Sequence, residues 1–124
     1  MDCARPRWSD ELSLSGPCSV VEVRNNELRE FTINAVDLGF QPADVTAVRG
    51  GDPAHNAQVV LDTFNGQLGA VRDIVVLNAA AGLTVAGVAS SMEEGVSLAQ
   101  ASIDNGSAIR VVEALKVSSN AVAR

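Results

Sequence analysis

The chain has 124 residues, of which 47% are hydrophobic and 3% aromatic, and its formal net charge is -6. This length fits one domain with a single core, and the apolar share excludes a disordered segment. The negative charge, with no cluster of Lys or Arg to offset it, argues against nucleic acid or an anionic membrane surface as a partner.

Cysteine and histidine are too sparse for a zinc site. Cys3 and Cys18 are too far apart for a Cys-x-x-Cys pair, and His55 is the only histidine. Both thiols are therefore expected to be free. No basic and then apolar leader opens the chain, so the cytoplasm is the expected location.

The N-terminal third of the chain predicts a β-hairpin. Met1–Trp8 shows no hydrophobic period and is predicted to be a tail or a loop. Ser19–Arg24 and Leu28–Ile33 are rich in residues that favour strands, and Asn25-Asn26 between them offers turn chemistry. Two antiparallel strands joined by a tight turn are the natural interpretation of this pattern.

Two capping patterns follow the hairpin. Asn34 is predicted to cap a helical turn over Ala35–Leu38, which Gly39 ends in a left-handed conformation. Asp52 precedes Pro53, the pairing of a capping carboxylate with proline at the first helical position, so a helix is predicted to begin there. Its apolar stripe is Ala57, Val60, Leu61 and Phe64, and it is predicted to end at Asn65-Gly66.

Arg72–Ala89 is the most apolar run of the chain and is predicted to form its core. Ile74 and Val75 favour a strand, but Asn78 through Gly82 and the length of the run favour a helix. Apolar residues lie on every side of the helical projection, which predicts a helix buried all round. The run is too short and too polar to span a bilayer.

Two further helices are predicted before the end of the chain. Ser91–Glu94 has the spacing of a capping box, so a helix is predicted to run from there to Asn105-Gly106. Ser107 is predicted to cap the last helix, which is expected to fray from Ser118 onward. The apolar positions are Val96, Leu98, Ala99 and Ile103 in the first, and Ile109, Val112 and Leu115 in the second.

Asp10-Glu11 is the candidate metal site. Adjacent side chains point apart on a strand or a helix, so the two carboxylates either converge from a loop or serve two ions on opposite sides. Mg²⁺ suits such a pair because it takes one or two carboxylates and completes its ligand set with phosphate oxygens and water. From spacing alone, a solvated acidic loop is the commoner arrangement.

Three other features receive structural interpretations. Arg49-Gly-Gly-Asp52 lacks the Lys-Ser/Thr of a phosphate loop and carries a carboxylate where the phosphate would sit, so it is interpreted as a helix start. Asp73–Gly82 superficially resembles a stretch of short-chain dehydrogenases, but the chain has no tyrosine to act as the acid. Asn78 is interpreted as an amide that satisfies backbone groups, and His55 as an exposed side chain.

Four motifs in register resemble anthranilate phosphoribosyltransferase. They are Ser9–Pro17, Arg49–Ala57, Arg72–Ala81 and Met92–Gly95, and the likeness extends from about residue 9 to residue 120. The resemblance implies an α/β fold in which residues 9–124 form the C-terminal part of a nucleoside phosphorylase/phosphoribosyltransferase catalytic domain. In the family a glycine-containing segment precedes the Asp-Glu pair. Residues 1–8 of this chain differ from that segment and are expected to form a divergent tail.

The resemblance implies a tryptophan-biosynthesis enzyme that moves a phosphoribosyl group from phosphoribosyl pyrophosphate to the amino group of anthranilate. It places Asp10 and Glu11 on the family's Asp-Glu pair, which binds Mg²⁺. The glycine-rich phosphoribosyl pyrophosphate loop and the anthranilate-contacting Arg of that family lie upstream of the pair. No catalytic or cofactor-binding residue is therefore assigned in this chain.

The chain is accordingly expected to be a fragment that is inactive alone, and a homodimer is one expectation for the intact enzyme. Two alternatives stay open at this point. One is a non-catalytic interaction module that keeps the fold and pairs with a complete subunit. The other is a fragment of a related pyrimidine nucleoside phosphorylase.

Overall fold

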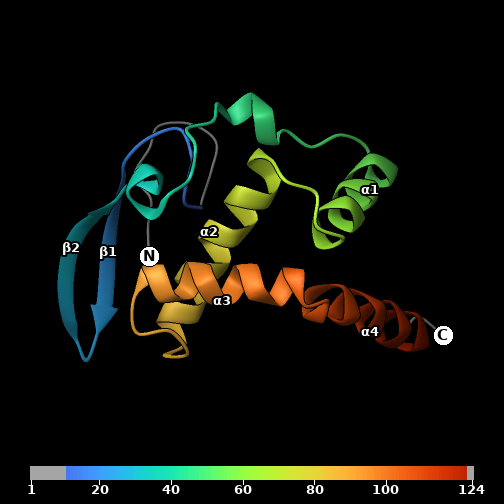
Figure 1. Cartoon of the computed structure of the whole chain (residues 1–124). Coiled ribbons are helices and arrows are strands. Elements are labelled where there is room, and N and C mark those ends of the chain that lie inside the picture. Colours follow the sequence, from blue (N-terminus) through green and yellow to red (C-terminus); the bar gives the residue numbers. More distant parts are fainter. Residues whose placement is uncertain (1–10, 123–124) are drawn as a thin grey trace.

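The computed structural model describes residues 11–122 of the chain (Figure 1). In that range an antiparallel hairpin is followed by four α-helices, so the predicted α/β arrangement is confirmed. The elements are β1 (Cys18–Arg24), β2 (Glu27–Ile33), the 3-10 turns η1 (Ala35–Leu38) and η2 (Val45–Val48), α1 (Pro53–Phe64), α2 (Ala70–Val85), α3 (Met92–Asp104) and α4 (Ser107–Val122).

The hairpin forms where the sequence predicts it. The turn residues Asn25 and Asn26 have φ angles of 52° and 63°, the conformation that a two-residue turn needs to match the twist of its strands. One face of the hairpin is buried through Cys18, Val20 and Ile33, whereas most of β2 is exposed. A two-stranded ribbon is marginally stable alone, so its packing on the helices keeps it in place.

The core lies where α2 crosses α3 (Figure 1). Leu77 and Ala80 of α2 have no exposed surface, and Val96 and Ala99 of α3 pack in the same cluster. At the crossing Gly95 faces the backbone of Ala80 so closely that a Cβ atom would lie 2.7 Å from the Ala80 carbonyl oxygen. The glycine is therefore required by the close approach of the two helices.

The core run is a helix, as predicted, but the expectation that it is buried all round is wrong. Ala79, Gly82 and Val85 are exposed on one side of α2. An apolar groove of about 460 Å³ runs along this side, with Phe64 of α1 and Leu98 of α3 among its lining residues. Part of the apolar surface of α2 is thus not covered by any of the described residues.

The apolar stripes of the other helices are also less buried than predicted. Leu98 of α3 is exposed beside the groove, although the same helix packs in the core through Val96 and Ala99. Ala57 and Val60 of α1 and Leu115 of α4 are exposed as well. Figure 1 shows why, because α1 and α4 lie on the side of the molecule away from the hairpin, and α4 extends outward from the end of α3. In the described chain, α1 and α4 therefore have few neighbouring elements on which to bury their apolar faces.

The predicted ends of α1 and α2 are set by local backbone groups. Asp52 accepts the N–H of His55 at 2.8 Å and Pro53 opens α1, while Gly66 adopts a φ of 103° just after that helix ends. The next helix stops at Val85, before the predicted Ala89. Gly87 reverses the chain there, donating its N–H to the Thr84 carbonyl, and Val88 donates to the Leu83 carbonyl.

The last two helices keep their predicted positions with altered caps. Ser91 accepts the N–H of Glu94 as predicted, but the Glu94 carboxylate accepts from the backbone and hydroxyl of Ser90 rather than from Ser91. Ser107 is the first residue of α4 and donates its N–H to the side chain of Asn105, so it is not the cap. In the structure α4 continues to Val122, and the fraying expected from Ser118 onward stays a prediction.

Across residues 11–122, no helix combines the length and the apolar character that crossing a membrane requires.

Candidate functional site

The site is the loop over residues 11–17, which enters the hairpin. Leu12 and Leu14 point into the core and are 4% and 3% exposed, Ser13 between them is half-buried, and Glu11 and Ser15 on either side are exposed. This alternation anchors the loop by its leucines and leaves Glu11 on the surface. Burial of two leucines stabilises this arrangement by about 1.5–3 kcal/mol each.

The amide of Asn78 in the middle of α2 fixes the start of this loop. The N–H of Leu12 donates to Asn78 Oδ1 at 2.8 Å, and Asn78 Nδ2 donates to the Leu12 carbonyl at 3.0 Å. Asn78 Nδ2 also donates to the Ile74 carbonyl at 3.0 Å, one helical turn earlier. The prediction that Asn78 satisfies backbone groups is confirmed.

Further contacts tie the loop to its surroundings. The N–H of Ser13 donates to the buried sulfur of Cys18 at 3.4 Å, and the N–H of Ala43 donates to the Leu14 carbonyl at 3.3 Å. The Cys18 thiol is free, as predicted, and Cys3 lies outside the described residues. The loop is thus connected to α2, to β1 and to the segment before η2.

The predicted metal pair is only partly within the described chain. Asp10 lies outside the described residues, and Glu11 is exposed at their start. Among residues 11–122 no three His, Cys, Asp or Glu side chains converge as a ligand set. The oxygen donors of an acidic pair still suit a hard cation, because Mg²⁺ draws ligands from phosphate and water as well. The pair remains a prediction.

The glycine-rich stretch before α1 is a helix start, as predicted. The N–H of Gly51 donates to Asn56 Oδ1 at 2.8 Å, and Asn56 Nδ2 donates back to the Gly51 carbonyl at 3.1 Å. Asp52 caps the helix with its carboxylate, so the amides of Gly51 and His55 already have partners and a carboxylate stands where a phosphate would bind. His55 is exposed, as predicted.

Sequence reasoning missed the role of the arginine that opens the core motif. Arg72 is buried, with its side chain 8% exposed, and forms an ion pair with Asp104 at 2.9 Å. The pair joins the start of α2 to the end of α3. Beside it, burial raises the pKa of Asp73 above its usual value, and the charge of Arg72 opposes that shift. The sequence signal for this ion pair was the presence of an arginine at the start of a strongly apolar run, where a buried charge needs a partner.

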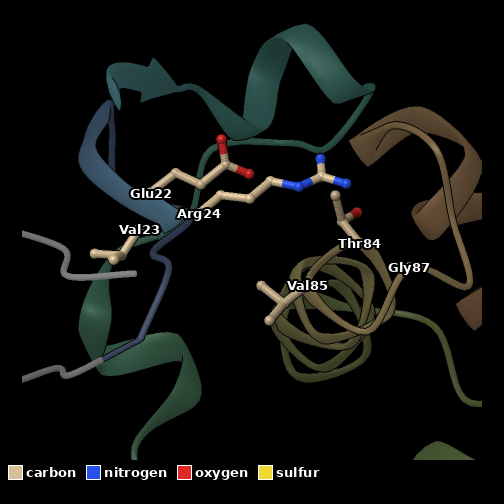
Figure 2. A pocket seen from close by; sticks show the side chains of 6 residues that line it. All are labelled: Glu22, Val23, Arg24, Thr84, Val85 and Gly87. Atoms are coloured by element: carbon tan, nitrogen blue, oxygen red, sulfur yellow. The ribbon is translucent and has the colours of Figure 1, made fainter. Parts of the chain in front are cut away.

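A smaller hollow lies between the end of β1 and the end of α2, with a volume of about 200 Å³. Figure 2 shows the side chain of Arg24 extending across it toward Thr84, with Glu22 alongside. The hydroxyl of Thr84 donates to the Ala80 carbonyl at 2.8 Å. These groups form a junction between the hairpin and α2 and offer no cluster of catalytic side chains.

Comparison with known proteins gives a consistent result. Residues 7–109 match the model of a glycosyl transferase family, a/b domain. The chain is 45% identical over 112 residues to anthranilate phosphoribosyltransferase of Methylorubrum extorquens, covering 90% of this chain and 33% of that protein. It is 44% identical over 117 residues to the same-named protein of Thermomicrobium roseum, covering 92% of this chain and 34% of that one. The chain thus spans about a third of the length of these curated relatives.

Solved structures agree with the sequence matches. The crystal structure of anthranilate phosphoribosyltransferase from Thermus thermophilus superposes with a TM-score of 0.77 at 34% identity, over 85% of this chain and 31% of that one. Anthranilate phosphoribosyltransferase from Saccharomyces cerevisiae superposes with a TM-score of 0.76, with the same coverage of both chains, at 23% identity, which bears on the fold alone.

Proposed function

We propose a function from the premise that the chain belongs to the glycosyl transferase family, a/b domain. It contributes part of an enzyme that transfers a phosphoribosyl group from phosphoribosyl pyrophosphate to anthranilate, a step of tryptophan biosynthesis. The observation that carries this proposal is the 45% identity over 112 residues to a protein of that name. A cytoplasmic location, expected from the sequence, is part of the same proposal.

Within this enzyme the acidic pair is proposed to hold Mg²⁺. Asp10 and Glu11 supply carboxylate oxygens, and the remaining ligands come from pyrophosphate oxygens and water, as is usual for this ion. When bound, Mg²⁺ neutralises charge on the pyrophosphate and so makes it a better leaving group. The exposure of Glu11 supports this role, because a substrate-bound cation can reach a residue on the surface.

The described residues serve the reaction by fixing the loop that begins at Glu11. Leu12 and Leu14 anchor the loop in the core, and Asn78 fixes its backbone. Positioning of the sugar phosphate and the acceptor, which can account for roughly 7–11 kcal/mol of a barrier, is proposed to come from residues outside this chain. The isolated chain is therefore expected to have no transferase activity.

The two alternatives have less support. The relatives described above are named anthranilate phosphoribosyltransferases, which favours that activity over a pyrimidine nucleoside phosphorylase. A non-catalytic interaction module would keep the same fold, so the activity test described next distinguishes it from an enzyme part.

The test is a chimera in which this chain replaces the matching segment of the Thermus thermophilus enzyme. Loss of anthranilate fluorescence is followed with phosphoribosyl pyrophosphate and Mg²⁺ present. Turnover is expected in the chimera and not in the 124-residue chain alone. Asp10→Ala and Glu11→Ala should each lower turnover strongly and leave thermal stability nearly unchanged, because Leu12 and Leu14, and not the two carboxylates, anchor the loop in the core.

Glu27→Gln is the matched control, because Glu27 is an exposed carboxylate at the far end of the hairpin. It should leave turnover unchanged. A folded chimera without turnover would favour the interaction module. Full turnover in the Asp10→Ala, Glu11→Ala double variant would show that the metal pair is wrongly assigned.

A further inference from the structure

We infer that the apolar groove along α2 is the docking surface for an apolar segment of the same enzyme, from the two thirds of its length that this chain does not span. This assignment rests on the part of the proposed function that makes the chain one piece of a longer enzyme. It adds the surface through which that piece joins the rest. The occupant is a stretch of polypeptide that presents aliphatic or aromatic side chains.

The groove connects the core to the surface. Val76, Ala99 and Ile103 line it and are also core residues, each with no more than 5% of its surface exposed. Leu98 and Val88 line it as well and are 39% and 62% exposed. The described residues thus leave one side of the core open over a volume of about 460 Å³.

The lining selects an apolar occupant. None of the residues that line the groove is charged, and Ser102 is the only one with a polar side chain. Water finds few hydrogen-bond partners on such a surface, so apolar groups displace it favourably. A charged ligand would instead lose its hydration without gaining partners. On the α2 wall, a Cβ atom added at Gly82 would meet nothing within 4 Å, so a side chain of the occupant has room to reach the helix.

The groove belongs to the part of the chain that the family shares. All of its lining residues lie between Phe64 and Ala108, inside residues 7–109, which match the family model. The Thermus thermophilus enzyme has the same framework with a TM-score of 0.77, and this framework covers only 31% of that chain. An exposed apolar groove of this kind marks an interaction surface. The longer relatives carry about two thirds of their length beyond it, which supplies the occupant.

A second copy of the chain fits the groove poorly. In a two-fold dimer the same face of each copy meets the other, so that groove would lie over groove and neither would be filled. Each copy also carries a formal net charge of -6, which opposes close association. Self-association through the groove is therefore an outcome that the experiment must distinguish.

The experiment compares the 124-residue chain with the chimera described above. Ala79→Glu places a carboxylate on the groove wall, and Ala101→Glu is the matched control, because both alanines are exposed on a helix but Ala101 does not line the groove. In the isolated chain both variants should shift the Tm by less than about 2 °C, as is usual for surface substitutions. In the chimera Ala79→Glu buries a charge and should lower the Tm by about 5–10 °C, whereas Ala101→Glu should again have little effect.

Thiol labelling supplies a second measurement, which serves if the Ala79→Glu chimera does not fold. Ala79→Cys and Ala101→Cys are treated with a maleimide, and mass spectrometry of the peptides gives the rate of reaction at each position. Ala79→Cys should react at least about 10-fold more slowly in the chimera than in the isolated chain, because the occupant covers it. Ala101→Cys should react at similar rates in both.

Two results would overturn the inference. One is an Ala79→Cys thiol that reacts as fast in the chimera as in the isolated chain, with no loss of Tm in the Ala79→Glu chimera. The other is an isolated chain that sediments as a dimer and becomes a monomer in Ala79→Glu, since the occupant would then be a second copy. Neither readout uses turnover, so a chimera that protects the groove but has no transferase activity would contradict the proposed function and leave this inference standing.

Discussion

Replacement of Gly95 by alanine tests the closest helix contact in the fold. Gly95 lies on α3 where it crosses α2, and a Cβ atom added there would be 2.7 Å from the carbonyl oxygen, 3.0 Å from Cα and 3.1 Å from Cβ of Ala80. These are atoms of a helix backbone and of its shortest side chain, so none of them can rotate away. The two helices must move apart to admit the methyl group.

The expected magnitude follows from two opposing effects. Overpacking of a close-packed core costs about 1–3 kcal/mol, and a contact with backbone places Gly95→Ala at the upper end of that range. Alanine is favoured over glycine inside a helix by about 1 kcal/mol, which offsets part of the cost. We therefore expect Gly95→Ala to lower the free energy of unfolding by about 2 kcal/mol.

Gly82→Ala is the matched control. Gly82 lies within α2, and a Cβ atom there would meet nothing within 4 Å. Only the helix preference operates at this position, so Gly82→Ala should raise the free energy of unfolding by about 0.5–1 kcal/mol. Urea unfolding followed by circular dichroism measures both variants. If Gly95→Ala proved as stable as the unaltered chain, the helices would not approach as closely as we describe.

Three further predictions concern charge and the apolar groove. Hydrogen bonds from the hydroxyl and backbone of Ser90 hold the pKa of Glu94 below its usual value of 4.5. The stability that this carboxylate contributes is therefore fully present above pH 4.5 and is lost as the pH falls through the lowered pKa. The difference between Glu94→Gln and the unaltered chain in urea unfolding should accordingly shrink as the pH is lowered from 7 into the acid range, and a difference that does not change with pH would contradict this. Asp104→Ala leaves the buried guanidinium of Arg72 without its partner and should lower the free energy of unfolding by about 1–3 kcal/mol, whereas no loss would mean that the ion pair does not join α2 to α3. The exposed groove should bind a fluorescent hydrophobic dye, with less fluorescence in Leu98→Glu, and a chain that leaves the dye unbound would show the groove to be closed in solution.

Local signals in the sequence predicted the elements and most of their ends. Asn25-Asn26 accept the positive φ angles of the hairpin turn, and Asp52 with Pro53 begins α1 as expected. These features succeed because a turn or a cap involves backbone groups within a few residues of the side chain that satisfies them. One partner still differed from the prediction, because the carboxylate of Glu94 accepts the N–H of Ser90 and not that of Ser91.

The metal pair is a different kind of prediction. Asp10 and Glu11 alone indicate no more than an acidic loop, and their proposed role comes from the resemblance of four motifs to a known family. Spacing along the chain could not supply it, because ligands of a metal and its phosphate are gathered from separate segments.

Only the tertiary structure decided which faces are buried and which distant residues meet. The pattern of α2 predicted burial all round, yet the packing leaves Ala79 and Gly82 exposed beside the groove. The bonds from Asn78 to Leu12 and the fit of Gly95 against Ala80 join residues that no local pattern connects. The physical reason is that hydrophobicity is not directional, so it tells which side chains leave water but not which neighbour covers them.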